Sequence, residues 1–175
     1  MNLNWVDCDD STHGAAILEL FNHAILHSTA LYDYKPRSRE QITQWFQLKA
    51  AQHFPVIGLV TPEGQLAGFA SYGAFRAFPA YQYTVEHAIY VHSDYSRRGI
   101  GTQLLTRLMA KAREQNYHTM IGVIDSQNAV SIALHQKLGF EEKGVLHEVG
   151  YKFGRWLDVV LYQKILSTPE HPTEG

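Results

Sequence analysis

The order in which strand-like and helical patterns follow one another constrains the fold of this chain more than any other feature. The patterns run β, α, α, β, β, β, α, β, α, β, β along the sequence. Consecutive strand patterns indicate hairpins, whereas strand–helix–strand patterns indicate crossover units. We therefore expect an α/β (α+β) domain in which a mixed sheet of about seven strands is flanked by about four helices. The expected strands are residues 2–8, 55–60, 66–75, 83–92, 118–124, 141–149 and 156–164.

The helical patterns carry signals for their ends. Ser11 or Thr12 is a candidate N-cap for the first helix. Ser38, followed three residues later by Gln41, predicts a capping box for the second helix, which extends to about residue 52. Gly139 fits a left-handed end of the fourth helix, which begins near residue 127. The positions expected to face the core are Ala16, Leu20, Ala24 and Leu26 of the first helix and Ile100, Leu104, Leu105, Leu108, Met109 and Ala112 of the third.

Charge and cysteine content narrow the functional classes. The formal net charge is −2, so the chain as a whole is not suited to bind nucleic acid, and any anion site has to be local. The single cysteine, Cys8, excludes an internal disulfide and a cysteine-based metal cluster. No apolar run reaches membrane-spanning length, and the stretch MNLNWVDCDD lacks the basic-then-apolar pattern of a signal peptide. We expect a cytoplasmic protein with no membrane partner, a single domain over residues 1–166 and a flexible C-terminal tail over 167–175.

The stretch SRRGIGTQLL, residues 96–105, joins an expected strand to the third helix. The first turn of a helix has unpaired backbone N–H groups and a partial positive charge. Two glycines here allow close approach of the backbone, and Arg97 and Arg98 add charge, so the stretch is suited to a diphosphate group. A glycine turn with solvated arginines is the alternative. The stretch is not a dinucleotide fingerprint, which needs glycine where Leu104 stands, and it lacks the Gly-Lys-Ser/Thr ending of a P-loop.

Several segments resemble a known family. YVHSDYSRRGIGTQLL is similar to the acyl-CoA signature of the GCN5-related N-acetyltransferases (GNAT), and SQNAVSIALHQKLGF is similar to their second cofactor segment. FRAFPAYQYTVEHAIYVH and VGYKFGRWLDVV further resemble the phosphinothricin and methionine sulfoximine acetyltransferase branch. The family usually has Gln or Arg where this chain has Ser96. The resemblance implies the GNAT fold, with a mostly antiparallel twisted sheet in which the fourth and fifth strands splay apart.

The resemblance also implies acetyl-CoA as a cosubstrate, with no metal. Its diphosphate is expected on the loop at residues 97–102, and its pantetheine arm is expected beside the strand at residues 89–91. An N–H group near Val91 would polarise the thioester carbonyl, and Asn128 matches the family asparagine near the pantetheine and the leaving thiol. The residues expected to bind the cofactor are Ile89, Tyr90, Val91, Arg97, Arg98, Gly99, Ile100, Gly101, Thr102 and Asn128.

Acetylation of an amine requires a base, because an ammonium group has no lone pair. Glu86 interrupts an apolar strand, where burial raises the pKa of a carboxyl, and the branch also has a glutamate in its TVE segment. A solvated strand face or an arginine partner is the alternative for Glu86. His135 stands where many family members have tyrosine and is a candidate proton donor for the leaving thiolate, with packing as the alternative. Strand alternation places His87 on the face opposite Glu86.

An amino-acid acceptor brings a carboxylate that has to be recognised. The forked guanidinium of Arg76 suits a carboxylate or a phosphinate. The resemblance places Phe75, Glu86 and Lys152 near the same pocket. Arg155 is a further candidate, with an ion pair to Asp158 or Glu148 as the alternative. Glu19, His23 and His27 fall at i, i+4 and i+8 on the first helix, and we interpret them as exposed residues rather than metal ligands.

These observations and the resemblance predict an acetyl-CoA-dependent N-acetyltransferase. Its expected acceptor is a small amino acid or an analogue such as phosphinothricin, methionine sulfoximine or methionine sulfone, whose amine attacks directly in a ternary complex. An acyl-cysteine route is not expected, because Cys8 has no visible base partner. Acetylation of peptide N-termini or polyamines and a non-catalytic CoA-binding sensor are the alternatives. The branch implies a homodimer.

Overall fold

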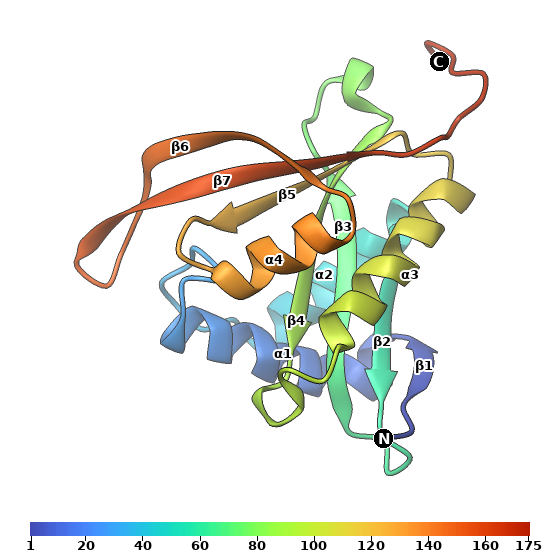
Figure 1. Cartoon of the computed structure of the whole chain (residues 1–175). Coiled ribbons are helices and arrows are strands. Elements are labelled where there is room, and N and C mark those ends of the chain that lie inside the picture. Colours follow the sequence, from blue (N-terminus) through green and yellow to red (C-terminus); the bar gives the residue numbers. More distant parts are fainter. The chain divides into compact units, whose positions relative to one another are not determined.

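The computed structural model describes residues 1–175 and has the order of elements that the sequence predicts (Figure 1). The strands are β1 (Asn4–Asp7), β2 (Val56–Val60), β3 (Leu66–Ala74), β4 (Thr84–Val91), β5 (Thr119–Asp125), β6 (Glu141–Lys152) and β7 (Arg155–Ile165). The helices are α1 (Asp10–His27), α2 (Arg39–Ala51), α3 (Ile100–Glu114) and α4 (Ala129–Lys137). Two short 3₁₀ turns, Pro79–Tyr81 and Ser93–Tyr95, lie before and after β4.

The seven strands are hydrogen-bonded in the order β1-β2-β3-β4-β5-β7-β6. The pairs β1–β2, β2–β3, β5–β7 and β6–β7 are antiparallel, whereas β4 and β5 are parallel. The parallel pairing joins only Thr84–Glu86 to Thr119–Ile121, although both strands continue beyond it. This early end of the pairing confirms the expected separation of the fourth and fifth strands. It leaves the rest of β4 without β5 as a partner.

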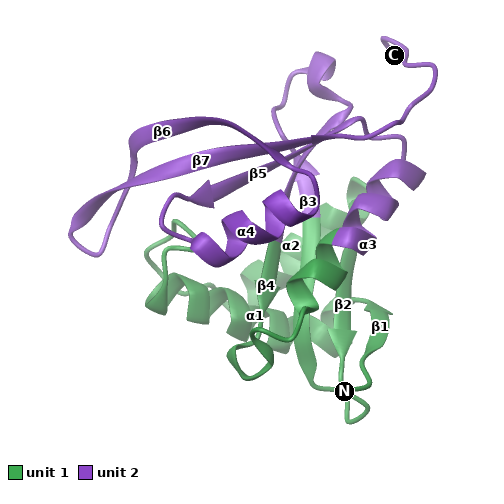
Figure 2. Cartoon of the chain, viewed as in Figure 1, with its two compact units in different colours: residues 1–71, 89–105 green, residues 72–88, 106–175 purple.

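The backbone divides into two compact units, which are described separately (Figure 2). Unit 1 comprises residues 1–71 and 89–105, and unit 2 comprises residues 72–88 and 106–175. The chain passes between the units inside β3, β4 and α3. The single domain expected over residues 1–166 stays a prediction. None of the helices combines the length and the apolar character needed to cross a membrane.

Aromatic rings form the core of unit 1. Phe21 of α1 lies edge to face against Trp45 of α2, with ring centroids 5.4 Å apart. Phe21 makes the same kind of contact with Phe69 of β3 and Tyr90 of β4, at 5.3 and 5.0 Å. Such edge-to-face pairs add to the free energy gained by removing the rings from water. Together they hold α1 and α2 on the strands of this unit.

The first helix differs from the sequence-based prediction at its start and on one face. Asp9 is the N-cap, not Ser11 or Thr12, and its Oδ1 accepts the N–H of Thr12 at 2.7 Å. An aspartate caps a helix as well as a hydroxyl residue does, so the signal was present two residues earlier. The prediction for Leu26 is also wrong, because its side chain is 46% exposed. The buried apolar stripe consists of Ile17, Leu20, Phe21, Ala24 and Ile25.

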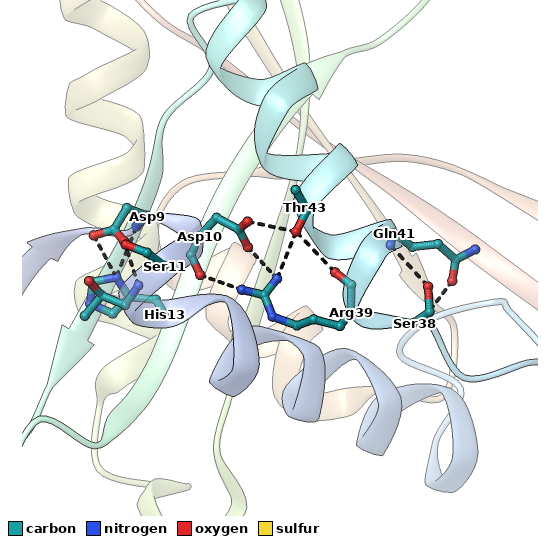
Figure 3. A network of polar contacts seen from close by, with 9 residues as sticks. Asp9, Asp10, Ser11, His13, Ser38, Arg39, Gln41 and Thr43 are labelled. Atoms are coloured by element: carbon teal, nitrogen blue, oxygen red, sulfur yellow. Dashed lines mark hydrogen bonds and ion pairs between the residues drawn. The ribbon is translucent and has the colours of Figure 1, made fainter.

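A polar network joins the N-terminal ends of α1 and α2 (Figure 3). Arg39 Nη1 lies 2.5 Å from Asp10 Oδ1, and its Nη2 donates to the Asp10 carbonyl at 2.8 Å. The Thr43 hydroxyl donates to the other carboxylate oxygen at 2.8 Å. The hydrogen bond from Arg39 holds the pKa of Asp10 below its ordinary value. The predicted capping box of Ser38 and Gln41 is confirmed on the same helix.

Unit 2 is built on β5, β7 and β6, with α4 packed against β5. β6 and β7 form a long hairpin (Figure 2). Gly139 has φ +83° and ends α4 in the left-handed conformation that the sequence predicts. The predicted inner face of α3, which runs through both units, is confirmed. Its buried residues are Ile100, Leu104, Leu105, Leu108, Met109 and Ala112.

The C-terminal residues contain neither helix nor strand but are hydrogen-bonded to unit 2 at two points. Thr168 Oγ1 donates to the Tyr117 carbonyl at 2.6 Å. The Thr173 N–H donates to the Tyr83 hydroxyl, which donates in turn to the Thr173 carbonyl, both at 2.9 Å. The flexibility expected of residues 167–175 stays a prediction.

Candidate active site

The loop that leads into α3 has the backbone conformation of an anion-binding turn. Arg97 and Gly99 both have positive φ, 60° and 75°. Left-handed residues alternating with ordinary ones aim successive N–H groups at one point, which is how backbone anion sites are built. A Cβ placed on Gly99 would meet no atom within 4 Å, so the backbone angle, not lack of space, favours glycine there.

The amides at the start of α3 are not used inside the chain. The first hydrogen bond of the helix runs from the Gln103 N–H to the Gly99 carbonyl, at 3.1 Å. The N–H groups of Ile100, Gly101 and Thr102 come before it and have no acceptor in the chain. Several donors and the positive end of the helix dipole therefore face one place, as a phosphate group requires.

The two arginines of this loop differ in their contacts. Arg98 lies over the Tyr95 ring, 5.6 Å from its centroid, and its Nη1 is 3.5 Å from the Met1 sulfur. The Tyr95 hydroxyl is held in turn by Gln65 Oε1, at 2.6 Å. Arg97 is exposed and has no partner in the chain. Arg97 is therefore free to contact an anion, whereas Arg98 has to leave contacts that it already makes.

The end of β4 borders an open space in unit 1. A cavity of about 210 Å³ lies between this strand and α1. Ile89, Tyr90 and Val91, the residues expected beside the pantetheine arm, form one of its walls. The remaining lining residues are Glu19, Leu20, His23, Ala24, Ser28, Ala30, His92 and Ser93. A strand edge without a partner beside a cavity is suited to an extended ligand with amide groups.

Glu86 is the last residue of β4 that pairs with β5, opposite Ile121. Its side chain is exposed and has no hydrogen-bond or ion-pair partner in the chain. The arginine partner that the sequence left open is therefore absent. Nearby protein atoms still displace part of the water around the carboxyl, and this desolvation raises the pKa of Glu86 above its ordinary value. A carboxyl with a raised pKa and free oxygens is equipped to act as a base.

His135 of α4 is buried and is hydrogen-bonded through both ring nitrogens. Its Nδ1 lies 2.7 Å from the Ser131 carbonyl oxygen, and its Nε2 lies 2.8 Å from Nε2 of His87. Burial lowers the pKa of His135, and burial together with His135 lowers the pKa of His87 to about 3. Both rings are therefore neutral at physiological pH. His87 lies on the face of β4 opposite Glu86, as strand alternation predicts, because it is buried where Glu86 is exposed.

Asn128 is the N-cap of α4. Its Oδ1 accepts the Ser131 N–H at 3.1 Å, and its own N–H donates to the Asp125 carbonyl at 2.9 Å. The side-chain NH₂ group has no partner in the chain. Asn128 is thus held rigidly while it keeps two donors for a ligand.

The proposed acceptor residues Phe75 and Arg76 meet at one aromatic ring. The Phe75 ring lies edge to face with Tyr81, at a centroid distance of 5.8 Å. The Arg76 guanidinium carbon lies 5.8 Å from the centre of the same ring and has no carboxylate partner. Arg76 is thereby oriented but not neutralised, as a receptor for a carboxylate has to be.

The other two basic candidates lie at the turn of the β6–β7 hairpin. Lys152 is buried, with Nζ 5.0 Å from the centre of the Phe153 ring, and is paired in register with Arg155. The structural ion pair considered for Arg155 is not formed, because the chain holds no partner for it. Asp158 instead accepts the Glu148 N–H at 2.8 Å. No hydrogen bond or ion pair joins Arg76 to Lys152 or to Arg155.

No cluster of three or more His, Cys, Asp or Glu side chains is arranged to hold a metal ion. His23 and His27 lie ring against ring, with centroids 5.0 Å apart. Glu19 and His23 instead line the cavity in unit 1.

Comparison with known proteins decides the family. Residues 18–140 match the Acetyltransferase (GNAT) family. The chain belongs to this family. The L-methionine sulfoximine/L-methionine sulfone acetyltransferase of Salmonella typhimurium is 41% identical over 163 residues, which cover 93% of each chain. A solved structure from Acinetobacter baylyi ADP1 is 51% identical, with a TM-score of 0.98 over 99% of this chain and 98% of that one. The phosphinothricin acetyltransferase of Sinorhizobium meliloti, solved in complex with acetyl-CoA, is 32% identical, with a TM-score of 0.93 over 100% and 95% of the two chains.

The GNAT acetyltransferases use acetyl-CoA, and the residues of this acetyltransferase fit that cosubstrate. The free amides of Ile100, Gly101 and Thr102 suit its diphosphate, and the open edge of β4 suits the amides of its pantetheine arm. When bound, acetyl-CoA supplies an acetyl group activated as a thioester. The usual Gln or Arg at position 96 is replaced by a serine, but the backbone donors do not depend on that side chain.

Sequence reasoning missed how the GNAT acetyltransferase holds His135. The partner His87 is 48 residues away in the chain, and no local pattern joins the two. The i, i+4 spacing of Ser131 and His135 was a usable signal, because a histidine can reach back to the carbonyl one turn earlier. Gly122 was a second signal, since a glycine inside a strand often marks the close approach of another group.

Proposed function

We propose that this acetyltransferase acetylates the amine of a small amino acid or an amino-acid analogue of the methionine sulfoximine, methionine sulfone or phosphinothricin type. The observation that carries the proposal is the position of Glu86. It stands where β4 leaves β5, with a raised pKa and no partner in the chain. The acceptors named for two relatives, methionine sulfoximine or sulfone and phosphinothricin, supply the substrate class.

In the proposed mechanism, Glu86 takes the proton from the acceptor ammonium, directly or through one water, and so frees the lone pair of the nitrogen. A backbone N–H at the end of β4, near Val91, donates to the carbonyl oxygen that gains negative charge. Asn128 holds the thiol end of the arm with its free NH₂ group. Transfer is direct, because the half-buried Cys8 thiol, whose pKa desolvation raises to about 12, stays protonated and is a poor nucleophile.

The hydrogen bonds of His135 favour its packing role over that of a proton donor. Its Nδ1 hydrogen is used by the Ser131 carbonyl, and its Nε2 faces His87. A direct contact with the leaving thiolate would require one of these bonds to break. We therefore propose that the leaving thiolate takes its proton from solvent. His135 is then a packing residue that supports the site.

Arg76 is the proposed receptor for the carboxylate of the acceptor, with Phe75 and Tyr81 beside it and Lys152 as a second positive charge. A guanidinium binds a carboxylate with two parallel hydrogen bonds, a geometry that lysine does not reproduce. The same positive charge opposes a polyamine, which would need an acidic cleft. The chain therefore suits an anionic, amino-acid-like acceptor better than a polycation.

An acetylation assay tests the acceptor class. The protein is incubated with acetyl-CoA and a panel that contains methionine sulfoximine, methionine sulfone, phosphinothricin, the free amino acids, spermidine and a peptide, and released CoA is measured. We expect turnover with the analogues and none with spermidine. Arg76→Lys should raise KM for these acceptors by about tenfold, which corresponds to one lost charge-assisted hydrogen bond, and leave KM for acetyl-CoA unchanged. Turnover of spermidine alone would overturn the proposal.

A homodimer in the cytoplasm is part of the same proposal. The β6–β7 hairpin exposes large apolar side chains on an edge of the sheet, of which Trp156 is 60% and Phe153 is 58% exposed. A second copy presents the same surface, so a two-fold contact would cover both copies at once. Light scattering after size exclusion tests this. We expect twice the mass of the chain for the parent and the mass of one chain for Trp156→Glu.

A further inference from the structure

Two buried histidines meet at the point in unit 2 where β4 and β5 separate. The strands pair up to Glu86 and Ile121, and His87 and Gly122 are the next residues on each strand. His135 reaches this point from α4, and its Nε2 lies 2.8 Å from Nε2 of His87. The two rings are stacked, with centroids 5.1 Å apart and 24° between their planes. A side-chain hydrogen bond thus joins α4 to β4 at the point where β4 and β5 separate. We call this point, formed by Glu86–His87 of β4 and Ile121–Gly122 of β5, the fork.

The hydrogen positions in this pair follow from its contacts. A carbonyl oxygen only accepts, so His135 Nδ1, which lies 2.7 Å from the Ser131 carbonyl oxygen, carries the hydrogen. The neutral ring then has a lone pair at Nε2, and His87 Nε2–H has to donate to it. His87 Nδ1 is left as a bare acceptor, and it is the only buried side-chain polar atom in the chain without a hydrogen-bond partner. Leaving such an atom unsatisfied costs free energy, which marks the His87–His135 bond as the reason for a histidine at this position.

Apart from Ser131, whose carbonyl and hydroxyl oxygens lie 2.7 and 3.5 Å from His135 Nδ1, no residue makes a further hydrogen bond to the pair. Phe140 contacts both rings, at centroid distances of 5.3 Å from His87 and 5.1 Å from His135. The one titratable neighbour is Tyr162 of β7, 6.3 Å from the His135 ring, and no carboxylate or cation faces the pair. A Cβ on Gly122 would lie 3.0 Å from His135 Nε2 and 3.2 Å from His87 Cε1, so an added methyl group would press on both rings and displace them by a few tenths of an ångström.

We propose that His87 is a positioning residue, whose hydrogen bond to His135 locks α4 onto β4 at the fork and thereby places Glu86 and Asn128. Glu86 precedes His87 on the strand, so the strand segment that carries the base is held by this bond. Asn128 begins the helix that His135 anchors, and Ser131 contacts both of them, through its N–H to Asn128 and its carbonyl to His135. This inference rests on the proposed function of Glu86 and Asn128.

His87→Gln and His87→Phe separate the hydrogen bond from the volume of the ring. A glutamine places an N–H donor near the position of Nε2 and keeps the bond to His135, whereas a phenylalanine fills the space without it. We expect kcat/KM to fall by about tenfold to a hundredfold in His87→Phe, because a small misplacement of a catalytic group has such effects. The kcat/KM of His87→Gln should stay within about threefold of the parent value, because this variant keeps the hydrogen bond and so leaves the catalytic groups in place.

The acid limb of the pH profile of kcat/KM is the readout that lost stability alone does not move, because it reports the pKa of the base. Desolvation raises the pKa of Glu86. A loosened fork admits water, so the midpoint should move to lower pH in His87→Phe and remain in place in His87→Gln. Gly122→Ala retains every titratable group and should also shift the midpoint to lower pH. This variant replaces His87→Phe in the test if His87→Phe does not fold.

Affinity for acetyl-CoA, measured by calorimetry, tests the effect on Asn128 without turnover. We expect weaker binding in His87→Phe and Gly122→Ala and normal binding in His87→Gln. Unchanged midpoints and affinities in His87→Phe and Gly122→Ala, with only a lower melting temperature, would show that the pair is merely structural. Equal damage in His87→Gln and His87→Phe would equally reject the hydrogen bond as the cause. If Glu86→Gln turns over like the parent, the base assignment fails instead, and the affinities still decide whether the pair positions α4.

Discussion

The proposed anion site at the start of α3 and the fork at the end of the β4–β5 pairing are built in opposite ways. The first is made of backbone amides, on consecutive residues, and its only side-chain requirement is glycine at a left-handed position. The second is made of side chains from β4 and α4 that approach across a glycine of β5. The first depends more on backbone angles than on side chains. The second depends on two rings that meet and on the space that Gly122 leaves beside them.

The largest expected effect is at the fork. Glu86→Gln should lower kcat by about a hundredfold to ten-thousandfold, the usual contribution of a general base. The affinity for acetyl-CoA, measured by calorimetry, should not change, because the amide is of equal size and the anion site is built elsewhere in the chain. Normal turnover of methionine sulfoximine by this variant would contradict the assignment of the base.

The second effect concerns stability in acid and again belongs to the fork. His87 and His135 stay neutral in the folded protein because burial lowers both pKa values, that of His87 to about 3. In the unfolded chain they take up protons near pH 6.5. The unfolded state therefore binds more protons below this pH, and the free energy of unfolding should fall by up to about 1.4 kcal/mol per pH unit for each histidine between pH 6.5 and the folded pKa.

Urea unfolding at pH 7.5, 6.0 and 5.0 measures this slope. His87→Gln should have a shallower slope than the parent, because one buried titratable ring is removed. His171→Gln, in the exposed C-terminal segment, is the matched control and should keep the slope of the parent. Equal slopes in all three proteins would mean that the buried pair is not the source of acid sensitivity.

The third effect tests the backbone site. Gly99→Ala should weaken acetyl-CoA binding, because an alanine at φ +75° is strained by about 1–2 kcal/mol and relaxes the turn that aims the amides. This corresponds to about fivefold to thirtyfold in Kd. Gly64→Ala is a close control, because Gly64 has φ +88° and equally open surroundings but lies in the β2–β3 turn. It should lose similar stability without any change in Kd.

The smallest expected effect is on the KM for acetyl-CoA and distinguishes the two arginines of the loop before α3. Arg97→Ala should raise KM for acetyl-CoA by about fivefold, the value of one exposed charge-assisted contact, and less at high salt. Arg98→Ala should have less effect on KM, because this side chain already contacts Tyr95 and Met1. The reverse order in steady-state kinetics at two salt concentrations would show that Arg98 is the phosphate ligand.

Local signals in the sequence predicted most of the elements and failed where several signals competed. The capping box at Ser38 and the buried face of α3 were correct, because each depends on residues within a few positions of one another. The start of α1 was placed too late, since Asp9, Ser11 and Thr12 are all good caps and only packing selects among them. Leu26 was predicted to be buried for a related reason. The helical repeat of α1 is compatible with more than one buried apolar face, and packing against the strands decides which face is buried.

The sequence by itself determined the turn before α3 and the free amides at the start of this helix, because glycine spacing and a helix start act within one short segment. It also indicated Glu86, as a charge in an apolar strand. Only the tertiary structure decided the surroundings of His135, since its hydrogen-bond partner is 48 residues distant and the glycine beside both rings comes from a third element. A site made of backbone is encoded locally, whereas a site made of converging side chains exists only when distant elements are packed together.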